Sequence, residues 1–304
     1  MPLPTNAISD FGRYIKATRS GPTARRYVIA VKMFLGWYGH FNSPLEQASR
    51  DTLSRYALTL LEADYQTTTI RSHLAGIAKF LRWLKEKHKI SVPDFHDPEL
   101  PAIKREVKDT LPQAALTEYF GAAGALDEPT RTAALLLPCS GLRCGEMVAL
   151  PLACLKRQRL TLDGKPKDVL MLRVTGKGGH ERAVPLLDEG ATLLVQYLKG
   201  WRRVHRDTKW LFPGRAGHMA TRTLRKAVQQ IRQPSGLSYT PHSMRRTYLT
   251  TLYRQGVEPT VLAKIAGHGN VQVLVDHYLG LDSQDIANAV HAKGGRLMKK
   301  GNAA

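Results

Sequence analysis

Apolar side chains recur at helical spacing along the chain up to about residue 90, and no strand-like alternation occurs there. In segments 22–38 and 49–61 the apolar positions lie three and four residues apart, as on one face of a helix. A third segment keeps this spacing from Ile70 to Leu84, and a weaker pattern covers 8–17. Because such stripes are stable only when buried against one another, this part of the sequence predicts a small helical bundle.

The helical periodicity stops between residues 91 and 113, where charged residues alternate with four prolines, Pro93, Pro98, Pro101 and Pro112. This composition is typical of a linker. We therefore expect a helical domain over residues 1–92, a linker over 93–112 and a second domain over 113–304.

The second domain is predicted to be mainly helical with a small β-sheet. Residues 169–174 and 182–186 have the composition of two strands, and the glycine-rich segment 176–179 is suited to the turn between them. Helical patterns cover 114–123, 128–137, 145–150, 189–201, 221–231, 242–254, 259–265, 271–277 and 282–291.

The chain is strongly basic, with 45 Lys and Arg against 25 Asp and Glu and a formal net charge of +20. This excess implies a polyanionic partner, either nucleic acid or an anionic membrane. A membrane protein would carry a long apolar span, a basic amphipathic helix or a lipidation signal, and the sequence has none that we recognise. We therefore expect a soluble intracellular protein that binds nucleic acid and does not bind a membrane.

Basic residues on the outward faces of the N-terminal helices are candidates for contacts with phosphates. They are Arg25, Arg26, Lys32, Arg71, Lys79 and Arg82. A solvated charged face is the alternative interpretation of the same pattern. The three cysteines are odd in number and lack paired metal-ligand spacing, so we expect reduced thiols, no disulfide framework and no metal site.

Four short segments carry residues suited to phosphate chemistry. His242 and Arg245 lie three residues apart at the start of a predicted helix, whose N-terminus favours anions. A helix-capping histidine beside a surface arginine would give the same pattern. Arg143 follows a Gly-Leu pair in an apolar neighbourhood, where an arginine needs an anionic partner. That partner could be a bound phosphate or, as the simpler alternative, the carboxylate of Glu146 three residues later.

The other two segments are equally short. Lys177 lies in the predicted β-turn, where a lysine is ordinarily only solvated. The segment resembles the phosphate-binding loop of ATPases only in part, because Met171 replaces its first glycine and Gly178 replaces its Ser or Thr. ATP binding is therefore disfavoured. His268 follows a glycine at a predicted helix end, and Tyr278 comes ten residues later.

The order and context of these residues resemble the tyrosine recombinase, or phage integrase, family. That family has an Arg after Gly-Leu, a Lys in a β-turn, H-x-x-R, a Gly-His or Gly-Trp pair, and a Tyr shortly afterwards. The matching residues here are Arg143, Lys177, His242, Arg245, His268 and Tyr278. The resemblance covers the whole chain and implies a SAM-like core-binding domain ahead of the catalytic domain, as in the simple two-domain Xer-like type without a further arm-binding domain.

The resemblance also implies a reaction. Tyr278 would attack a DNA phosphate held by Arg143 and Arg245, with His242 as proton acceptor, His268 as phosphate donor and Lys177 as general acid, and Glu146 would orient these groups. No metal, ATP or other cofactor is implied.

By the same resemblance, four copies of the chain would assemble on two double-stranded DNA sites, each with inverted repeats. They would exchange strands through a Holliday junction, either alone or with a second recombinase or an accessory protein. A cytoplasmic, nucleoid-associated location follows. An apolar stripe formed by Ile286, Ala289 and Val290 is expected to dock either on a neighbouring copy or within the same chain.

Two other functions remain open from the sequence. A type IB topoisomerase shares the Tyr, Arg and Lys chemistry but swivels one strand. A DNA-binding regulator of the same fold would have lost Tyr278 or an arginine, and this sequence retains them.

Overall fold

A computed structural model of the chain describes residues 6–103, 110–176, 178–205, 207–215, 217–231, 239–272 and 274. The chain divides into two compact units, Met1–Arg105 and Glu106–Ala304. The predicted linker, 93–112, spans this division.

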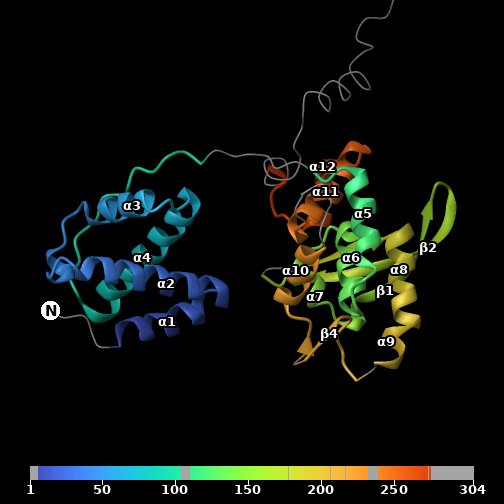
Figure 1. The fold of residues 1–304 in the computed structure, drawn as a ribbon, viewed down its shortest axis with the longest axis horizontal. Coiled ribbons are helices and arrows are strands. Elements are labelled where there is room, and N and C mark those ends of the chain that lie inside the picture. Colours follow the sequence, from blue (N-terminus) through green and yellow to red (C-terminus); the bar gives the residue numbers. More distant parts are fainter. Residues whose placement is uncertain are drawn as a thin grey trace, which may run out of the picture. The chain divides into compact units, whose positions relative to one another are not determined.

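The first unit is a bundle of four helices (Figure 1), namely α1 (Ala7–Thr18), α2 (Gly21–Gly39), α3 (Thr52–Glu62) and α4 (Thr67–His88), with a short 3₁₀ helix at Leu45–Gln47. The four predicted apolar stripes form the bundle core, in which Phe11 meets Phe80 edge to face with ring centroids 5.1 Å apart. Helix α3 begins three residues later than predicted, because Ser49 and Asp51 form a turn before it.

The second unit contains the remaining helices (Figure 1). In the described part of the chain they are α5 (Gln113–Ala123), α6 (Thr130–Ser140), α7 (Cys144–Val148), α8 (Asp188–Lys199), α9 (Trp201–Val204), α10 (Thr221–Gln230), α11 (Pro241–Arg254) and α12 (Pro259–Ala266), with a 3₁₀ helix at Leu152–Cys154. The prediction of a single helix over 189–201 was wrong at its C-terminal end. Gly200 has a non-helical backbone, so α8 ends at Lys199 and α9 begins at Trp201. The predicted helix over 282–291 lies outside the described residues. Among those that are described, no helix is both long and apolar enough to cross a bilayer.

An antiparallel sheet of three strands lies beside these helices in the order β1 (Leu155–Leu162), β2 (Lys165–Thr175) and β3 (Glu181–Leu186). The two predicted strands are β2 and β3, and β1 was missed. Strands β1 and β2 are joined at Asp163 and Gly164, both with positive φ, as in the tight turns that suit a twisted hairpin. A second pair, β4 (Pro213–Gly214) and β5 (Gly217–His218), was not predicted either. The mainly helical fold with a small sheet is confirmed.

Helix α6 runs through the centre of the second unit, and most of its residues are buried, including an unbroken run from Thr132 to Leu137. It packs against α8, α10 and α11, so the turn that ends it is held by several neighbours. Gly141 closes the helix with a φ of 62°, a left-handed conformation that glycine adopts without a Cβ penalty. This turn leads directly to Arg143 and α7.

Candidate active site

Arg143 caps the start of α7 and is held by Glu146. The Glu146 Oε2 accepts a hydrogen bond from the Arg143 backbone N–H at 2.9 Å, and Oε1 accepts one from Arg143 Nη1 at 2.9 Å. Arg143 Nη2 donates to the carbonyl of Gly267 at 3.4 Å. The alternative partner considered from the sequence, Glu146, is therefore present. The Arg143 side chain nevertheless remains 40% exposed, so it is accessible to a ligand as well.

Arg245 lies on α11 and is almost fully buried, with 1% of its side chain exposed. Its Nη1 donates to the carbonyl of Gly141 and its Nη2 to the carbonyl of Ala266, each at 2.6 Å. Of the two residues predicted to lie on the outward face of α11, His242 is exposed to solvent and Arg245 is buried. The two carbonyls hold the Arg245 guanidinium between the end of α6 and the end of α12.

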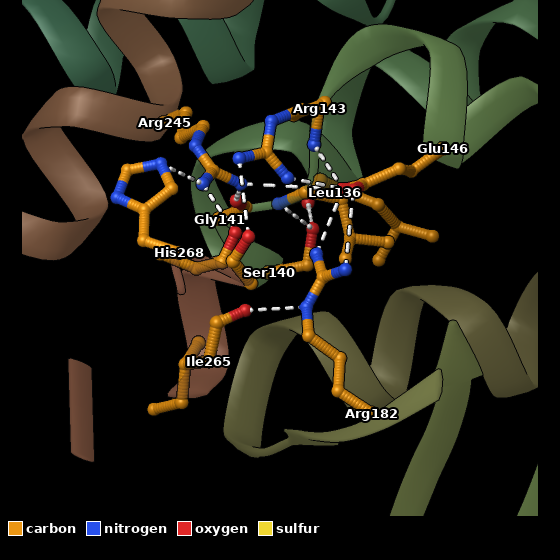
Figure 2. Close-up of polar contacts among 12 residues, drawn as sticks. Leu136, Ser140, Gly141, Arg143, Glu146, Arg182, Arg245, Ile265 and His268 are labelled. Carbon is orange, nitrogen blue, oxygen red and sulfur yellow. Dashed lines mark hydrogen bonds and ion pairs between the residues drawn. The ribbon is translucent and has the colours of Figure 1, made fainter. Parts of the chain in front are cut away.

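His268 follows α12 and contacts Arg245, with 3.3 Å between Nε2 and Arg245 Nη2 (Figure 2). Because a guanidinium can only donate, Nε2 must be the acceptor and the neutral ring carries its proton on Nδ1. Burial, and then the positive charges of Arg245, Arg143 and Arg182, lower the pKa of His268 to about 4. His268 is therefore neutral at physiological pH, and its Nε2 accepts a hydrogen bond from Arg245.

Glu146 has a second arginine partner that the sequence analysis did not single out. Arg182 of β3 donates from Nη1 to Oε1 at 3.1 Å and from Nη2 to Oε2 at 2.7 Å (Figure 2). Burial disfavours the ionised form of Glu146, but the hydrogen bonds from Arg182 and Arg143 outweigh it, so the pKa of Glu146 is lowered. Glu146 is thus an ionised carboxylate between two guanidinium groups.

A signal for Arg182 was present in the sequence. In a strand, alternate residues face the same side. Arg182 therefore shares a side with Val184 and Leu186, both of which are buried. A charge at an inward-facing strand position needs an ionic partner, so the pattern of β3 alone indicates that Arg182 is paired.

The start of α11 is less open to anions than a bare helix end. Pro241 has no N–H group, and the Ser243 N–H donates to the capping Thr240 Oγ1 at 2.9 Å. The backbone N–H groups of this helix start therefore offer less to an anion than the sequence analysis predicted.

His242 is exposed and lines a cavity of about 810 Å³ together with Arg143 and Arg245. Arg225 and Gln229 of α10, which the sequence analysis did not select, line it as well. Both are exposed residues of a helix with a long polar face, and nothing in the sequence separates them from other solvated positions.

Two predicted site residues, Lys177 and Tyr278, lie outside the described residues. Two described residues on either side of Lys177 are joined by a hydrogen bond of 2.8 Å, from the Gly176 N–H to the His180 carbonyl. A Cβ built on Gly176 would lie 3.8 Å from Glu146 Oε1. The residue before Lys177 is therefore close to the carboxylate that binds Arg143.

The predicted phosphate-contacting residues of the first unit lie on α2 and α4. Five are exposed, and Lys79 is half-buried, with its Nζ 5.7 Å from the centroid of the Tyr14 ring. Lys79 therefore also contributes a cation–π contact within the bundle. Arg26 lines a cavity of about 260 Å³ with Thr68, Thr69 and other residues of α2 and α4.

The three cysteines, all within the described residues, are free thiols. Burial raises the pKa of Cys139 to about 12 and that of Cys154 to about 11. A thiol with a pKa in this range is protonated and unreactive at neutral pH, so neither is suited to be a nucleophile.

Both units match known protein families. Residues 103–285 match the model of the phage integrase family, and residues 8–88 match that of the phage integrase N-terminal SAM-like domain. The first match covers more than half of the chain.

Named relatives span most of the chain. It is 25% identical over 261 residues to tyrosine recombinase XerD of Pseudomonas putida, covering 83% of this chain and 84% of that protein. It is 26% identical over 294 residues to tyrosine recombinase XerC of Corynebacterium efficiens, covering 93% of this chain and 89% of that protein.

Experimental structures share the fold at lower identity. One is the XerH site-specific recombinase bound to a palindromic difH substrate, with a TM-score of 0.68, 17% identity and coverage of 93% of this chain and 84% of that one. Another is a lambda integrase dimer bound to a COC′ core site, with a TM-score of 0.65, 15% identity and coverage of 98% and 80%. At such identity the likeness concerns the fold alone.

Proposed function

This chain belongs to the phage integrase family, and we propose that it is a site-specific tyrosine recombinase that cleaves and rejoins DNA through a covalent bond between Tyr278 and a 3′ phosphate. The proposal is supported above all by one observation. Arg143, His242 and Arg245, from two segments a hundred residues apart, line the same cavity, and His268 contacts Arg245.

Cleavage of a phosphodiester requires stabilisation of the negative charge that develops on the phosphorane. We assign this task to Arg143 and Arg245, and their different exposure suggests different contributions. Arg143, the more accessible one, would donate directly to a non-bridging oxygen. Arg245, whose Nη atoms already donate to carbonyls, would act mainly through its charge. We keep His268 as a further donor to the phosphate. In the present geometry its Nε2 accepts from Arg245 and its proton is on the buried Nδ1, so donation requires a change of tautomer when DNA binds.

The reaction balances without an external energy source. The Tyr278 phenol oxygen forms a bond to phosphorus while its proton passes to His242, and the bond from phosphorus to the 5′ oxygen breaks as Lys177 protonates that oxygen. A free phenol has a pKa of about 10 and is rarely ionised at neutral pH, so a proton acceptor is needed. The phosphotyrosyl bond conserves the bond energy, and a 5′ hydroxyl from another strand can reverse the step.

The partners follow from the same proposal. We assign to this protein a double-stranded DNA site with inverted repeats and a homotetramer on two duplexes, with strand exchange through a Holliday junction. A second recombinase or accessory protein is compatible with this scheme. The XerH and lambda integrase structures contain DNA, which supports DNA as the partner. We further propose a location in the cytoplasm near the nucleoid. The apolar stripe of Ile286, Ala289 and Val290 lies outside the described residues.

The decisive experiment is covalent capture. Wild-type protein, Tyr278→Phe and the control Tyr253→Phe are incubated with nicked DNA fragments from the neighbourhood of the gene that carry inverted repeats. We expect SDS-resistant adducts with wild type and the control, none with Tyr278→Phe, and similar duplex binding by all three. Adducts formed by Tyr278→Phe at the wild-type level would refute the assignment of the nucleophile.

A second assay separates recombination from relaxation. The family match favours a recombinase over a type IB topoisomerase. A plasmid with two sites should yield recombinant products, whereas rapid relaxation of a supercoiled plasmid without a site would support the topoisomerase instead. A regulator without catalytic activity would bind the sites and form no adduct.

A further inference from the structure

The guanidinium of Arg182 is enclosed by the polypeptide, and all three of its nitrogens donate hydrogen bonds. Nη1 and Nη2 bind the two oxygens of Glu146, and Nε donates to the carbonyl of Ile265 at 2.7 Å. Only 10% of the Arg182 side chain and 8% of the Glu146 side chain are exposed. This geometry fixes the plane of the Glu146 carboxylate from one side.

Arg182 also lies against the glycines that precede two predicted catalytic residues. A Cβ built on Gly267, just before His268, would be 2.9 Å from Arg182 Nη1. A Cβ built on Gly176, just before Lys177, would be 3.5 Å from the same atom. The guanidinium therefore lies beside both Gly267 and Gly176 and leaves little room for a side chain at Gly267.

Glu146 carries this constraint on to the exposed arginine. Its Oε1 accepts from both Arg182 and Arg143, and its Oε2 accepts from Arg182 and from the Arg143 backbone. Arg245 Nη1 lies 4.0 Å from Oε2. With one carboxylate among three guanidinium groups, the cluster keeps a net positive charge for an anionic ligand. Without Arg182 the cluster would lose one positive charge, and the Glu146 carboxylate would no longer be held from the side of β3.

We propose that Arg182 is a positioning residue of this active site, which holds Glu146, and through it Arg143, at a fixed place relative to Gly176 and Gly267, the residues that precede Lys177 and His268 in the chain. The inference rests on the proposed recombinase function and adds a residue to it. Arg182 does not touch the DNA phosphate in this scheme. It acts before the reaction, by holding a donor already aimed at the phosphate.

The shape of the contact makes a specific demand on the side chain. A lysine has the same charge, but a single ammonium cannot bind two carboxylate oxygens and the Ile265 carbonyl in one plane. Arg182→Lys should therefore keep the fold and the charge and still lose the alignment. Misplacement of a catalytic group by about 1 Å can reduce a rate about 100-fold.

The test compares DNA affinity with the single-turnover rate of adduct formation at saturating protein. Arg182→Lys and Arg182→Met are compared with wild type and with Arg173→Lys and Arg173→Met. Arg173 is a suitable control because it pairs across the sheet with Ala183, next to Arg182, and is exposed. We expect both Arg182 variants to form adducts about 100-fold more slowly, with DNA affinity and melting temperature of Arg182→Lys close to wild type. The Arg173 variants should react at the wild-type rate.

A double variant shows whether Arg182 acts through Glu146. If it does, Glu146→Gln combined with Arg182→Lys will be no slower than the slower of the two single variants, because effects transmitted through one contact are not additive. The inference would be overturned if the rate losses of the two single variants multiplied in the double variant. It would also be overturned if folded Arg182→Lys formed adducts at the wild-type rate. If wild-type protein itself forms no adduct, the proposed function fails instead, so the two failures are distinguishable.

Discussion

The ring of Tyr248 packs directly on Gly141, so that a Cβ on this glycine would lie 2.5 Å from Tyr248 Cδ1. Gly141 also has a φ of 62°, and its carbonyl accepts the hydrogen bond from Arg245 Nη1. Glycine is therefore required between α6 and Arg143 for two reasons, the left-handed turn and the close packing against Tyr248, and the same turn presents its backbone carbonyl to Arg245.

Gly141→Ala should destabilise the protein and impair adduct formation together. The left-handed backbone costs an alanine about 1 kcal/mol, and overpacking against Tyr248 adds about 1–3 kcal/mol. Thermal unfolding measures the loss. Gly145→Ala is the control, because Gly145 lies in the neighbouring α7 and a Cβ built on it would meet no described side chain within 4 Å. Its melting temperature should be unchanged or higher, and equal losses in both variants would contradict the packing argument.

The helices could be predicted from the sequence where one face is apolar. The stripes of α2 and α4 identify them without any knowledge of their neighbours, because a buried face at helical spacing leaves a pattern. The order of Arg143, His242, Arg245 and His268 in the chain indicated the family, which is confirmed.

Strand β1 and the partner of Arg182 could not be found in the same way. The sequence of β1, Leu-Lys-Arg-Gln-Arg-Leu-Thr-Leu, is mostly exposed and has no clear alternation, so its strand conformation comes from pairing with β2. Arg182 acquires its importance from Glu146, thirty-six positions away. Such a contact depends on which elements meet in the fold, and local patterns carry no information about that.

Glu146→Gln should reduce stability, because it leaves the charge of the nearly buried Arg182 without its partner. Removing one member of a buried ion pair costs about 3–5 kcal/mol, and partial exposure of Arg143 places the expected loss at the lower end. Chemical denaturation at neutral pH measures this loss.

The effect should also depend on pH. The pKa of Glu146 is lowered from its ordinary value of 4.5, so its contribution is fully present above pH 4.5 and is lost as the pH falls through its folded-state value. The wild-type advantage over Glu146→Gln should therefore shrink in acid. An advantage that stays constant with pH would contradict an ionised Glu146.

His268 should titrate far below an ordinary histidine. Its pKa is lowered from 6.5 to about 4 by burial and by the neighbouring arginines, so the folded state resists protonation. Because the unfolded chain binds the proton more readily, this contribution to stability is complete above pH 6.5 and is lost as the pH falls toward 4. NMR titration of the His268 ring, assigned with a His268→Gln variant, gives the value directly.

The same spectra test the proton position and the origin of the shift. Nitrogen chemical shifts should show Nδ1 protonated and Nε2 unprotonated at neutral pH, as the contact with Arg245 requires. Arg143→Gln should raise the pKa of His268, because one of the positive charges that lower it is removed. A titration near 6.5 in wild type, or no response to Arg143→Gln, would contradict the electrostatic description.

Arg26→Gln should weaken DNA binding and reduce its dependence on salt. Arg26 is exposed on α2 and lines a cavity with Thr68 and Thr69 at the start of α4, where a phosphate could bind to all three. Each phosphate contact releases condensed counterions, so losing one should lower the slope of log K against log salt by about 0.9. Arg13→Gln is the matched control, because Arg13 is an exposed arginine of the same bundle already paired with Asp10 at 2.5 Å. Its charge is neutralised within the protein, and the slope should stay at the wild-type value. If both variants lower the slope equally, binding responds to total charge, and the assignment of Arg26 as a phosphate contact is wrong.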